Sequence, residues 1–199
     1  MPIVSKLNFI IKQNQKPFYE SSAITGLVPK LHFKVEKKTV NIFSARKRNK
    51  TNLDKNGFEL HKLETNYNQY NIINNLNLYK KELKRFLKKK YEYKHLFIFD
   101  LTIRSNTQKG ALNLDGRRQP AERVHVDYTL KSGPYRAKEI IGTCLYNKTL
   151  AMKGRIIQLN IWRPLCKIVL SSPLAFALPK SVLKKDLVAT DQRFPDRTG

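Results

Sequence analysis

The sequence has few cysteines, few acidic residues and no long apolar run, and these shortages limit what the protein can be. Its two cysteines, Cys144 and Cys166, are too few for a disulfide framework and lack the spacing of a zinc site. No apolar run approaches the roughly 18 residues that span a membrane, and the N-terminus has no continuous signal-peptide core. We therefore expect a cytoplasmic protein with free thiols and no membrane partner.

Acidic residues are scarce relative to basic ones. Across 199 residues, 15 Asp and Glu oppose 39 Lys and Arg, which gives a formal net charge of +24. Such an excess is typical of nucleic-acid-binding proteins, but the lysines are spread over most of the chain. They occur together with abundant asparagine, as in residues 66–77, which indicates a compositional bias as much as a binding face. We expect no specific nucleic-acid partner, and a basic nucleic-acid-binding protein stays open as an alternative.

The hydrophobic pattern predicts one domain rich in strands. No internal repeat or Gly/Ser linker divides the chain, whose hydrophobic residues make up 41%. Apolar side chains from Ile72 to Lys90 recur at three- and four-residue steps, which predicts an amphipathic helix, and Tyr135–Leu150 has helical spacing too. Short strands are expected at Leu7–Lys12, Lys30–Val35, Thr39–Phe43, Phe58–Leu63, His95–Ile103, Arg123–Leu130, Arg155–Arg163 and Lys167–Leu170, with a mobile loop at Asn106–Gly116. This pattern fits a mainly β sandwich or barrel with flanking helices.

The most informative short motif is His125-Val126-Asp127. On an extended segment, alternate side chains point to the same face, so the imidazole and the carboxylate can turn toward one metal ion. A second histidine would complete the two-His-one-carboxylate triad of non-haem Fe(II) oxygenases. The tripeptide alone is a weak signal, because a single histidine in a strand-rich stretch is more often structural. The other histidines, His32, His61 and His95, all lie upstream.

Several segments in order strengthen this motif. They are Leu53–Leu60 (LDKNGFEL), Ile98–Arg104 (IFDLTIR), Val124–Thr129 (VHVDYT), Asn160–Leu165 (NIWRPL), Ser172–Ala175 (SPLA), Asp186–Val188 (DLV) and Pro195–Gly199 (PDRTG). In their order and spacing, they resemble the fungal hydroxylase/desaturase family related to the cephem-methoxylase subunit, the AsaB- and CmcJ-like proteins. The resemblance covers most of the chain from Leu7 to Gly199.

This resemblance implies a fold, a chemistry and a set of site residues. The fold is a double-stranded β-helix (jelly-roll or cupin-like), formed by residues 1–199 as a single oxygenase-like domain. The cofactors are Fe(II) and 2-oxoglutarate, with His125 and Asp127 as catalytic residues and as the first two iron ligands. Asn160, Trp162 and Arg163 are expected to line the cofactor pocket. Arg163 suits a carboxylate partner, although the residue alone slightly favours a structural ion pair at a strand end.

One departure from the family pattern concerns the third ligand. In that family, a later histidine followed by Thr-Ala-Phe resembles the third ligand, whereas no histidine follows His125 here. The resemblance therefore implies a truncated member that lacks its C-terminal strands. We expect an oxidoreductase that acts on an organic small molecule, in secondary metabolism, with a catalytically inactive fragment of the same fold as the alternative. Arg104 and Arg123 border the matched segments, and we expect both to be solvated.

Overall fold

The computed structural model describes residues 1–25, 29–47, 51–106, 117–196 and 198–199. The chain forms two compact units, each assembled from segments that are distant in sequence. The first unit contains Met1–Leu60, Thr102–Thr129 and Leu174–Gly199, and the second contains His61–Leu101 and Leu130–Pro173. The loop expected at Asn106–Gly116 lies outside the described residues apart from Asn106 itself.

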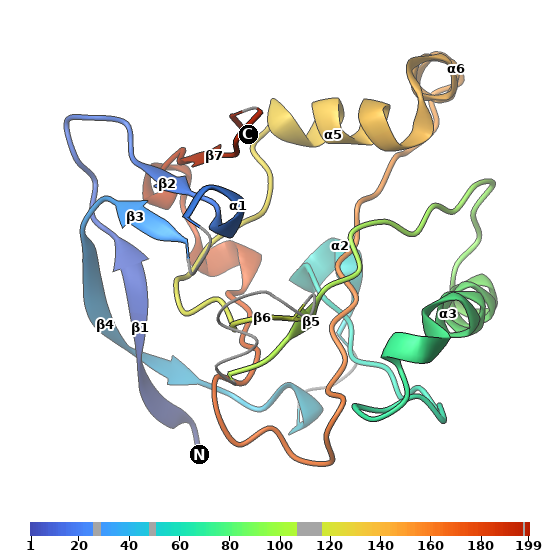
Figure 1. Cartoon of the computed structure of the whole chain (residues 1–199), viewed down its shortest axis with the longest axis horizontal. Helices are drawn as coiled ribbons and strands as arrows, with labels where there is room; N and C mark the ends of the chain where they lie inside the picture. Colours follow the sequence, from blue (N-terminus) through green and yellow to red (C-terminus); the bar gives the residue numbers. More distant parts are fainter. Residues whose placement is uncertain (26–28, 48–50, 107–116, 197) are drawn as a thin grey trace. The chain divides into compact units, whose positions relative to one another are not determined.

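The longest strand pair of the first unit joins two eight-residue segments rich in β-branched side chains. Strand β1 (Ile3–Ile10) runs antiparallel to β4 (Val35–Ile42), with Ile3 opposite Ile42 and Ile10 opposite Val35 (Figure 1). Among the described residues this sheet has only these two strands. Lysines on β4, Lys37 and Lys38, are exposed there, as is common on edge strands that avoid further pairing.

Two smaller sheets contain the other described strands of this unit. In the first, β2 (Phe18–Glu20) lies between β3 (Lys30–His32), which is antiparallel to it, and β7 (Asp191–Arg193), which is parallel. The second sheet pairs β5 (Ile103–Arg104) with β6 (Arg117–Arg118) in parallel. The β2–β7 pairing brings the last residues of the chain beside a strand near its start.

Helix α2 (Leu53–Asn56) of the same unit is a single turn with a capping residue at each end. The Asn52 side chain accepts hydrogen bonds from the backbone N–H groups of Asp54 and Lys55, which caps the start. Gly57 ends the helix at φ 74°, a left-handed conformation that glycine adopts without steric cost. The described part of the unit also contains a short helix, α1 (Ser22–Thr25), and 3-10 turns at Ala45–Lys47, Pro179–Ser181 and Lys184–Asp186.

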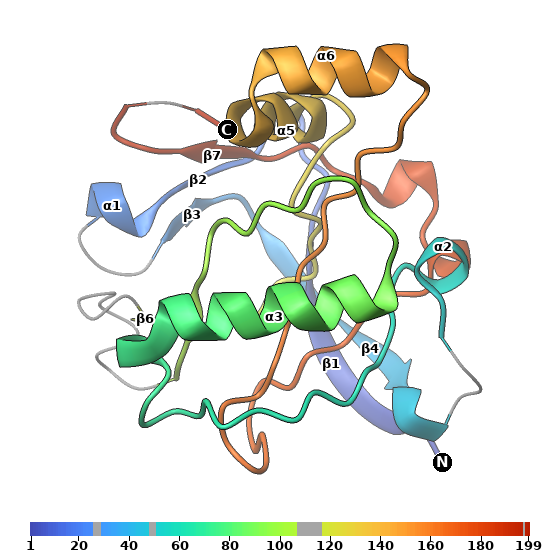
Figure 2. The ribbon, with the colours of Figure 1, turned by 90° about the vertical axis from the view of Figure 1, so that its right-hand side faces the viewer.

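The second unit is built on helix α3 (Leu76–Lys90), which a 3-10 turn at Ile73–Asn75 precedes. Tyr79, Leu83 and Leu87 recur every four residues and are buried on one face. Three lysines occupy the last turn, where positive charge stabilises the helix dipole. The helix predicted over Ile72–Lys90 is therefore confirmed, and Figure 2 shows it as one straight element.

Two further helices of this unit replace the single one expected over Tyr135–Leu150. Helix α5 (Ser132–Ile141) and helix α6 (Thr143–Ala151) are separated by Gly142, whose φ of 81° ends the first helix. The two views agree that the chain changes direction sharply at this point (Figures 1 and 2). A side chain at this position would be strained, so the glycine accounts for the break.

Five of the expected strands are not strands. Phe58–Leu63, His95–Ile103, Arg123–Leu130, Arg155–Arg163 and Lys167–Leu170 follow irregular backbone, in which pairing is confined to Ile103 and to one bridge at Arg123. Apolar alternation marks a segment that could form a strand, but the strand also needs a partner for its backbone groups. The mainly β prediction thus gives way to a mixed arrangement of sheet and helix.

Few apolar side chains of the described residues are deeply buried. Apart from Pro17, the buried set is Ile72, Tyr79, Leu83, Leu87 and Ala137, all in the second unit. By contrast, Ile157, Ile161 and Leu170 are 53%, 48% and 91% exposed, although strands with an inward face were expected there. No described helix combines the length and apolar content that crossing a membrane requires.

Candidate functional site

The segment that carries His125 and Asp127 belongs to the first unit and is tied to β1. The Val124 N–H donates to the Asn8 carbonyl at 2.9 Å, and Asn8 forms an isolated parallel bridge with Arg123. The Asn8 side-chain amide also donates to the Glu122 carbonyl at 3.3 Å. These bonds hold the backbone just before His125, so the pair does not depend on the longer strand that the sequence predicted.

A hydrogen bond sets the orientation of the His125 ring. Nδ1 lies 2.7 Å from the Arg123 carbonyl oxygen. A carbonyl only accepts, so Nδ1 carries the hydrogen and donates it. In the neutral ring Nε2 then keeps its lone pair, and it lies 3.6 Å from Oδ1 of Asp127. Two acceptors that face each other in this way can both coordinate one metal ion.

The separation of these two atoms is close to that of neighbouring metal ligands. Ligand atoms about 2.1 Å from one ion and about 90° apart lie about 3.0 Å from each other. A small rotation of either side chain would close the gap from 3.6 Å. The side chains of His125 and Asp127 are 37% and 47% exposed, which leaves the space between them accessible. A backbone carbonyl on the second imidazole nitrogen is also the usual support of a metal-binding histidine.

The described residues supply two ligands and no third. Among them, no group of three or more His, Cys, Asp or Glu side chains is placed to hold a metal ion. His32, in the same unit, stacks on Phe18 with ring centroids 4.3 Å apart and lies 3.4 Å from Oε1 of Glu20. His61 and His95 belong to the second unit, where His61 Nε2 lies 3.3 Å from the Tyr91 hydroxyl.

Arg123 is not the solvated side chain that the sequence predicted. Its guanidinium carbon lies 5.3 Å from the Tyr19 ring centroid and 4.8 Å from that of Phe33. Nη1 is buried and has no hydrogen-bond partner among the described residues. Leaving such a donor unpaired costs about 1–3 kcal/mol. Arg104 is exposed, as expected, and donates to the Gln119 carbonyl at 2.9 Å.

Burial and nearby charges shift the ionisation of this cluster. Burial lowers the pKa of Arg123, because the charged guanidinium loses hydration. Burial also raises the pKa of Tyr19, and the Asp127 carboxylate raises it further, whereas Arg123 and Arg104 oppose the change. Tyr19, Arg123 and Asp127 therefore share one electrostatic environment in the first unit. The sequence offered no signal for Tyr19 or Phe33, since their role depends on contacts between distant segments.

The other three expected site residues, Asn160, Trp162 and Arg163, lie in the second unit. Trp162 is 47% exposed. Arg163 packs against α3, where Nε donates to the Tyr79 hydroxyl at 3.0 Å and the guanidinium lies 4.9 Å from the ring centroid. Its Nη2 is buried without a hydrogen-bond partner among the described residues. The ion pair that was one interpretation of Arg163 is therefore replaced by a hydrogen bond and a ring contact.

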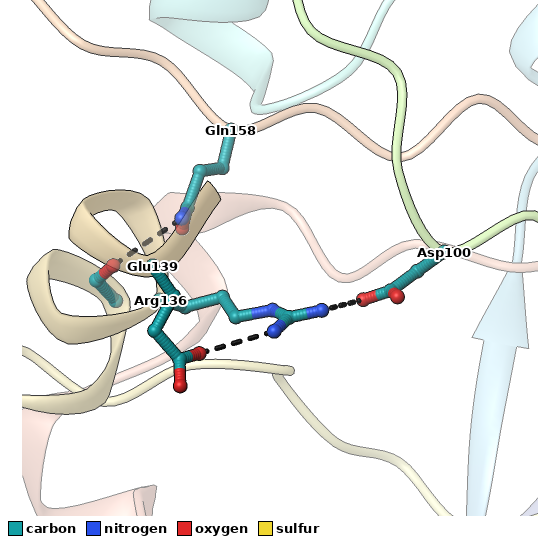
Figure 3. Close-up of polar contacts among 5 residues, drawn as sticks. Asp100, Arg136, Glu139 and Gln158 are labelled. Atoms are coloured by element: carbon teal, nitrogen blue, oxygen red, sulfur yellow. Dashed lines mark hydrogen bonds and ion pairs between the residues drawn. The ribbon is translucent and has the colours of Figure 1, made fainter. Parts of the chain in front are cut away.

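A network of polar side chains connects α5 to other segments of the second unit (Figure 3). Arg136 pairs with Asp100 at 2.7 Å and with Glu139 at 3.0 Å, and these hydrogen bonds raise the pKa of Arg136. Asp100 has a φ of 48°, a left-handed conformation that is uncommon outside glycine. The Gln158 side chain donates to the Gly133 carbonyl at 3.2 Å. The network thus links irregular segments of the second unit, including the one that leads to Asn160, to a regular helix.

Comparisons with known proteins found one family and one solved structure to which the chain is similar. Residues 7–199 match the family described as the oxidoreductase/YMDC permease-like domain. The structure is also similar to that of the iron and alpha-ketoglutarate-dependent endoperoxidase NvfI, with a TM-score of 0.55 and 18% sequence identity. The match covers 75% of this chain and 55% of that one, so the chain spans about half the length of this relative, and the likeness concerns the fold alone. No curated protein matches the chain significantly. With nearly its whole length matched, the chain belongs to the oxidoreductase/YMDC permease-like domain family.

Proposed function

We propose that this protein is a non-haem oxidoreductase of the Fe(II)- and 2-oxoglutarate-dependent type that hydroxylates or desaturates an organic small molecule. The observation that carries the proposal is the pair formed by His125 Nε2 and Asp127 Oδ1, 3.6 Å apart, with the imidazole fixed by the Arg123 carbonyl. The similarity to an iron-dependent enzyme supports a double-stranded β-helix as the fold, with both units in one oxygenase-like domain. The order of the matched segments supports the AsaB- and CmcJ-like branch and a role in secondary metabolism.

The donor set of the pair suits ferrous iron. A neutral imidazole and a carboxylate are two of the three protein ligands of the facial triad, which leaves the opposite positions for substrates. Iron with 2-oxoglutarate supplies the oxidising chemistry, and the protein supplies binding and orientation. In this proposal His125 and Asp127 hold the metal. For Arg163, Trp162 and Asn160 of the second unit, cofactor binding stays our proposal, which the unpaired Nη2 of Arg163 supports.

Metal binding by matched histidine variants tests this proposal. Purified chain is titrated anaerobically with Fe(II), and His125→Ala and Asp127→Ala are compared with His95→Ala, which removes an exposed histidine from the second unit. We expect weak binding, because two protein ligands hold the ion, and a loss of at least about tenfold in both pair variants. Equal affinity in His125→Ala and in His95→Ala would reject the pair as a metal site.

A second candidate function is binding of nucleic acid through α3. A cavity of about 360 Å³ in the second unit is lined by Asn77, Lys80, Lys81, Lys84 and Ile98, so three positive charges surround it. Phosphate contacts of this kind make affinity fall steeply with salt. Duplex DNA binding is measured over a range of salt for wild type and for the pair Lys80→Gln and Lys84→Gln. If the slope of log affinity against log salt concentration were the same in the double variant as in wild type, this surface would not be a nucleic-acid site.

A further inference from the structure

Helix α3 presents three lysines to one cavity of the second unit. The cavity has a volume of about 360 Å³ and is lined by Asn77, Lys80, Lys81, Lys84 and Ile98. The three lysines follow Asn77 at three, four and seven positions, so these four side chains share one side of the helix. The volume lies within the range that is typical of sites for small ligands.

The opposite wall of the cavity comes from the chain that follows α3. Ile98 lies in the irregular segment after the helix, and Figure 2 shows the chain reversing its direction there. The Tyr93 hydroxyl donates to the Lys84 carbonyl at 3.3 Å, which holds the start of this segment against the helix. The cavity is therefore formed within one unit, between a regular helix and a segment that is hydrogen-bonded to it.

Among the described residues, no carboxylate forms an ion pair with the lysines that line the cavity. The lysines that form ion pairs there are Lys16, Lys38 and Lys62, and none of them belongs to α3. The helix has seven basic residues and one acidic residue, Glu82, which does not line the cavity. Three positive charges around one hollow repel one another and attract anions, because a cleft of one sign focuses the electric field.

We propose that this cavity binds a small anion that carries two or more linked phosphate groups. Each lysine ammonium offers three rotatable N–H donors to phosphate oxygens, and the Asn77 amide offers two more. An anion with several phosphates can meet all three ammonium groups at once, whereas a single phosphate meets fewer of them. A cavity of this volume suits a compact anion, and duplex DNA is the competing ligand for the same lysines.

Phosphate binding at this cavity does not depend on the proposed oxidoreductase activity. The cavity belongs to the second unit and the His125–Asp127 pair to the first, and phosphate binding requires no metal. Metal-free wild type and metal-free His125→Ala should therefore bind the anion with the same affinity. Fe(II) binding by the pair is measured separately, so either proposal can fail without the other.

Titration calorimetry of metal-free protein with sodium tripolyphosphate and with orthophosphate tests the inference. At about 0.15 M salt the Debye length is about 8 Å, so distant charges are screened. Lys80→Gln/Lys84→Gln removes two charges from the cavity, whereas the control Lys89→Gln/Lys90→Gln removes two from the exposed last turn of the same helix. We expect a loss of tripolyphosphate affinity of at least about tenfold in the first double variant and of less than about threefold in the control. Orthophosphate should bind wild type at least about tenfold more weakly than tripolyphosphate.

Three results would overturn the inference. Equal losses in the two double variants would mean that only the total charge matters, and equal wild-type affinities for both anions would exclude linked phosphates as the ligand. Duplex DNA is titrated under the same conditions. If Lys80→Gln/Lys84→Gln weakened duplex binding and left tripolyphosphate binding unchanged, the lysines would be a nucleic-acid contact instead.

A second variant keeps the test decisive if the first does not fold, which circular dichroism shows. Ile98→Glu keeps every lysine and places a carboxylate in the cavity. It should lower tripolyphosphate affinity by at least about tenfold, because the added charge repels the anion and pairs with the lysines. Wild-type affinity in folded Ile98→Glu would reject the cavity as the binding site.

Discussion

Replacement of Leu83 by alanine tests whether α3 is anchored by one buried face. Leu83 is 5% exposed in the middle of the helix, whereas Leu78, five residues earlier on the same helix, is 49% exposed. The two leucines have the same helix propensity and differ in burial. Leu78→Ala is therefore a control for every effect of the substitution except the loss of buried contacts.

The expected magnitude follows from this difference in burial. Removing a buried leucine side chain costs about 2–5 kcal/mol, and sites whose neighbours can relax lie at the low end. The buried set of the second unit is small, so we expect a loss of about 2–3 kcal/mol in the free energy of unfolding for Leu83→Ala. For Leu78→Ala we expect a change within about 0.5 kcal/mol.

Urea unfolding followed by circular dichroism measures both values under the same conditions. In thermal unfolding, the Leu83→Ala loss corresponds to a decrease in Tm of about 4–12 °C for a chain of this size. The urea midpoint should change, whereas the m value, which is the slope of the unfolding free energy against urea concentration, should stay the same. Equal destabilisation by the two substitutions would refute the assignment of Leu83 to the buried face of α3.

Two further predictions concern the polar clusters. Burial raises the pKa of Tyr19 above its ordinary value of 10.0, so the neutral phenol stabilises the fold below pH 10.0, and this contribution is lost as the pH rises through the higher folded value. Between about pH 8 and about pH 11, the free energy of urea unfolding should decrease more in wild type than in Tyr19→Phe. An equal decrease in both would contradict the raised pKa of Tyr19. A double-mutant cycle of Arg136→Gln and Asp100→Asn should give a coupling of at most about 1 kcal/mol, because the two side chains are 29% and 61% exposed. A coupling several times larger would mean that the pair is shielded from solvent.

Local periodicity was sufficient where the element depends mainly on its own sequence. The helix from Leu76 to Lys90 satisfies its backbone hydrogen bonds internally, so the spacing of Tyr79, Leu83 and Leu87 identified it correctly. The break at Gly142 was missed because the apolar spacing continues across it, although the glycine itself is a visible signal. The strand expected at Arg155–Arg163 was wrong for a different reason: its partner would have to come from elsewhere in the chain.

The candidate site could be predicted from the sequence only in part, because some of its contacts come from distant parts of the chain. The convergence of His125 and Asp127 is a property of a short segment, and their atoms lie 3.6 Å apart even without a regular strand. The environment of Arg123 depends on Tyr19 and Phe33, which other strands and loops bring to it. The roles of Asn160, Trp162 and Arg163 stay predictions, since the resemblance that suggested them specifies no contacts.

The most direct test of the central claim is a double-mutant cycle on Fe(II) affinity with His125→Ala, Asp127→Ala and the double variant. If both side chains bind one ion, each single substitution removes most of the affinity, and the second then adds little. We predict this non-additive result, with all three variants at the same residual affinity and with unchanged unfolding midpoints. Additive losses, or wild-type affinity in any of the three variants, would contradict a shared metal ion.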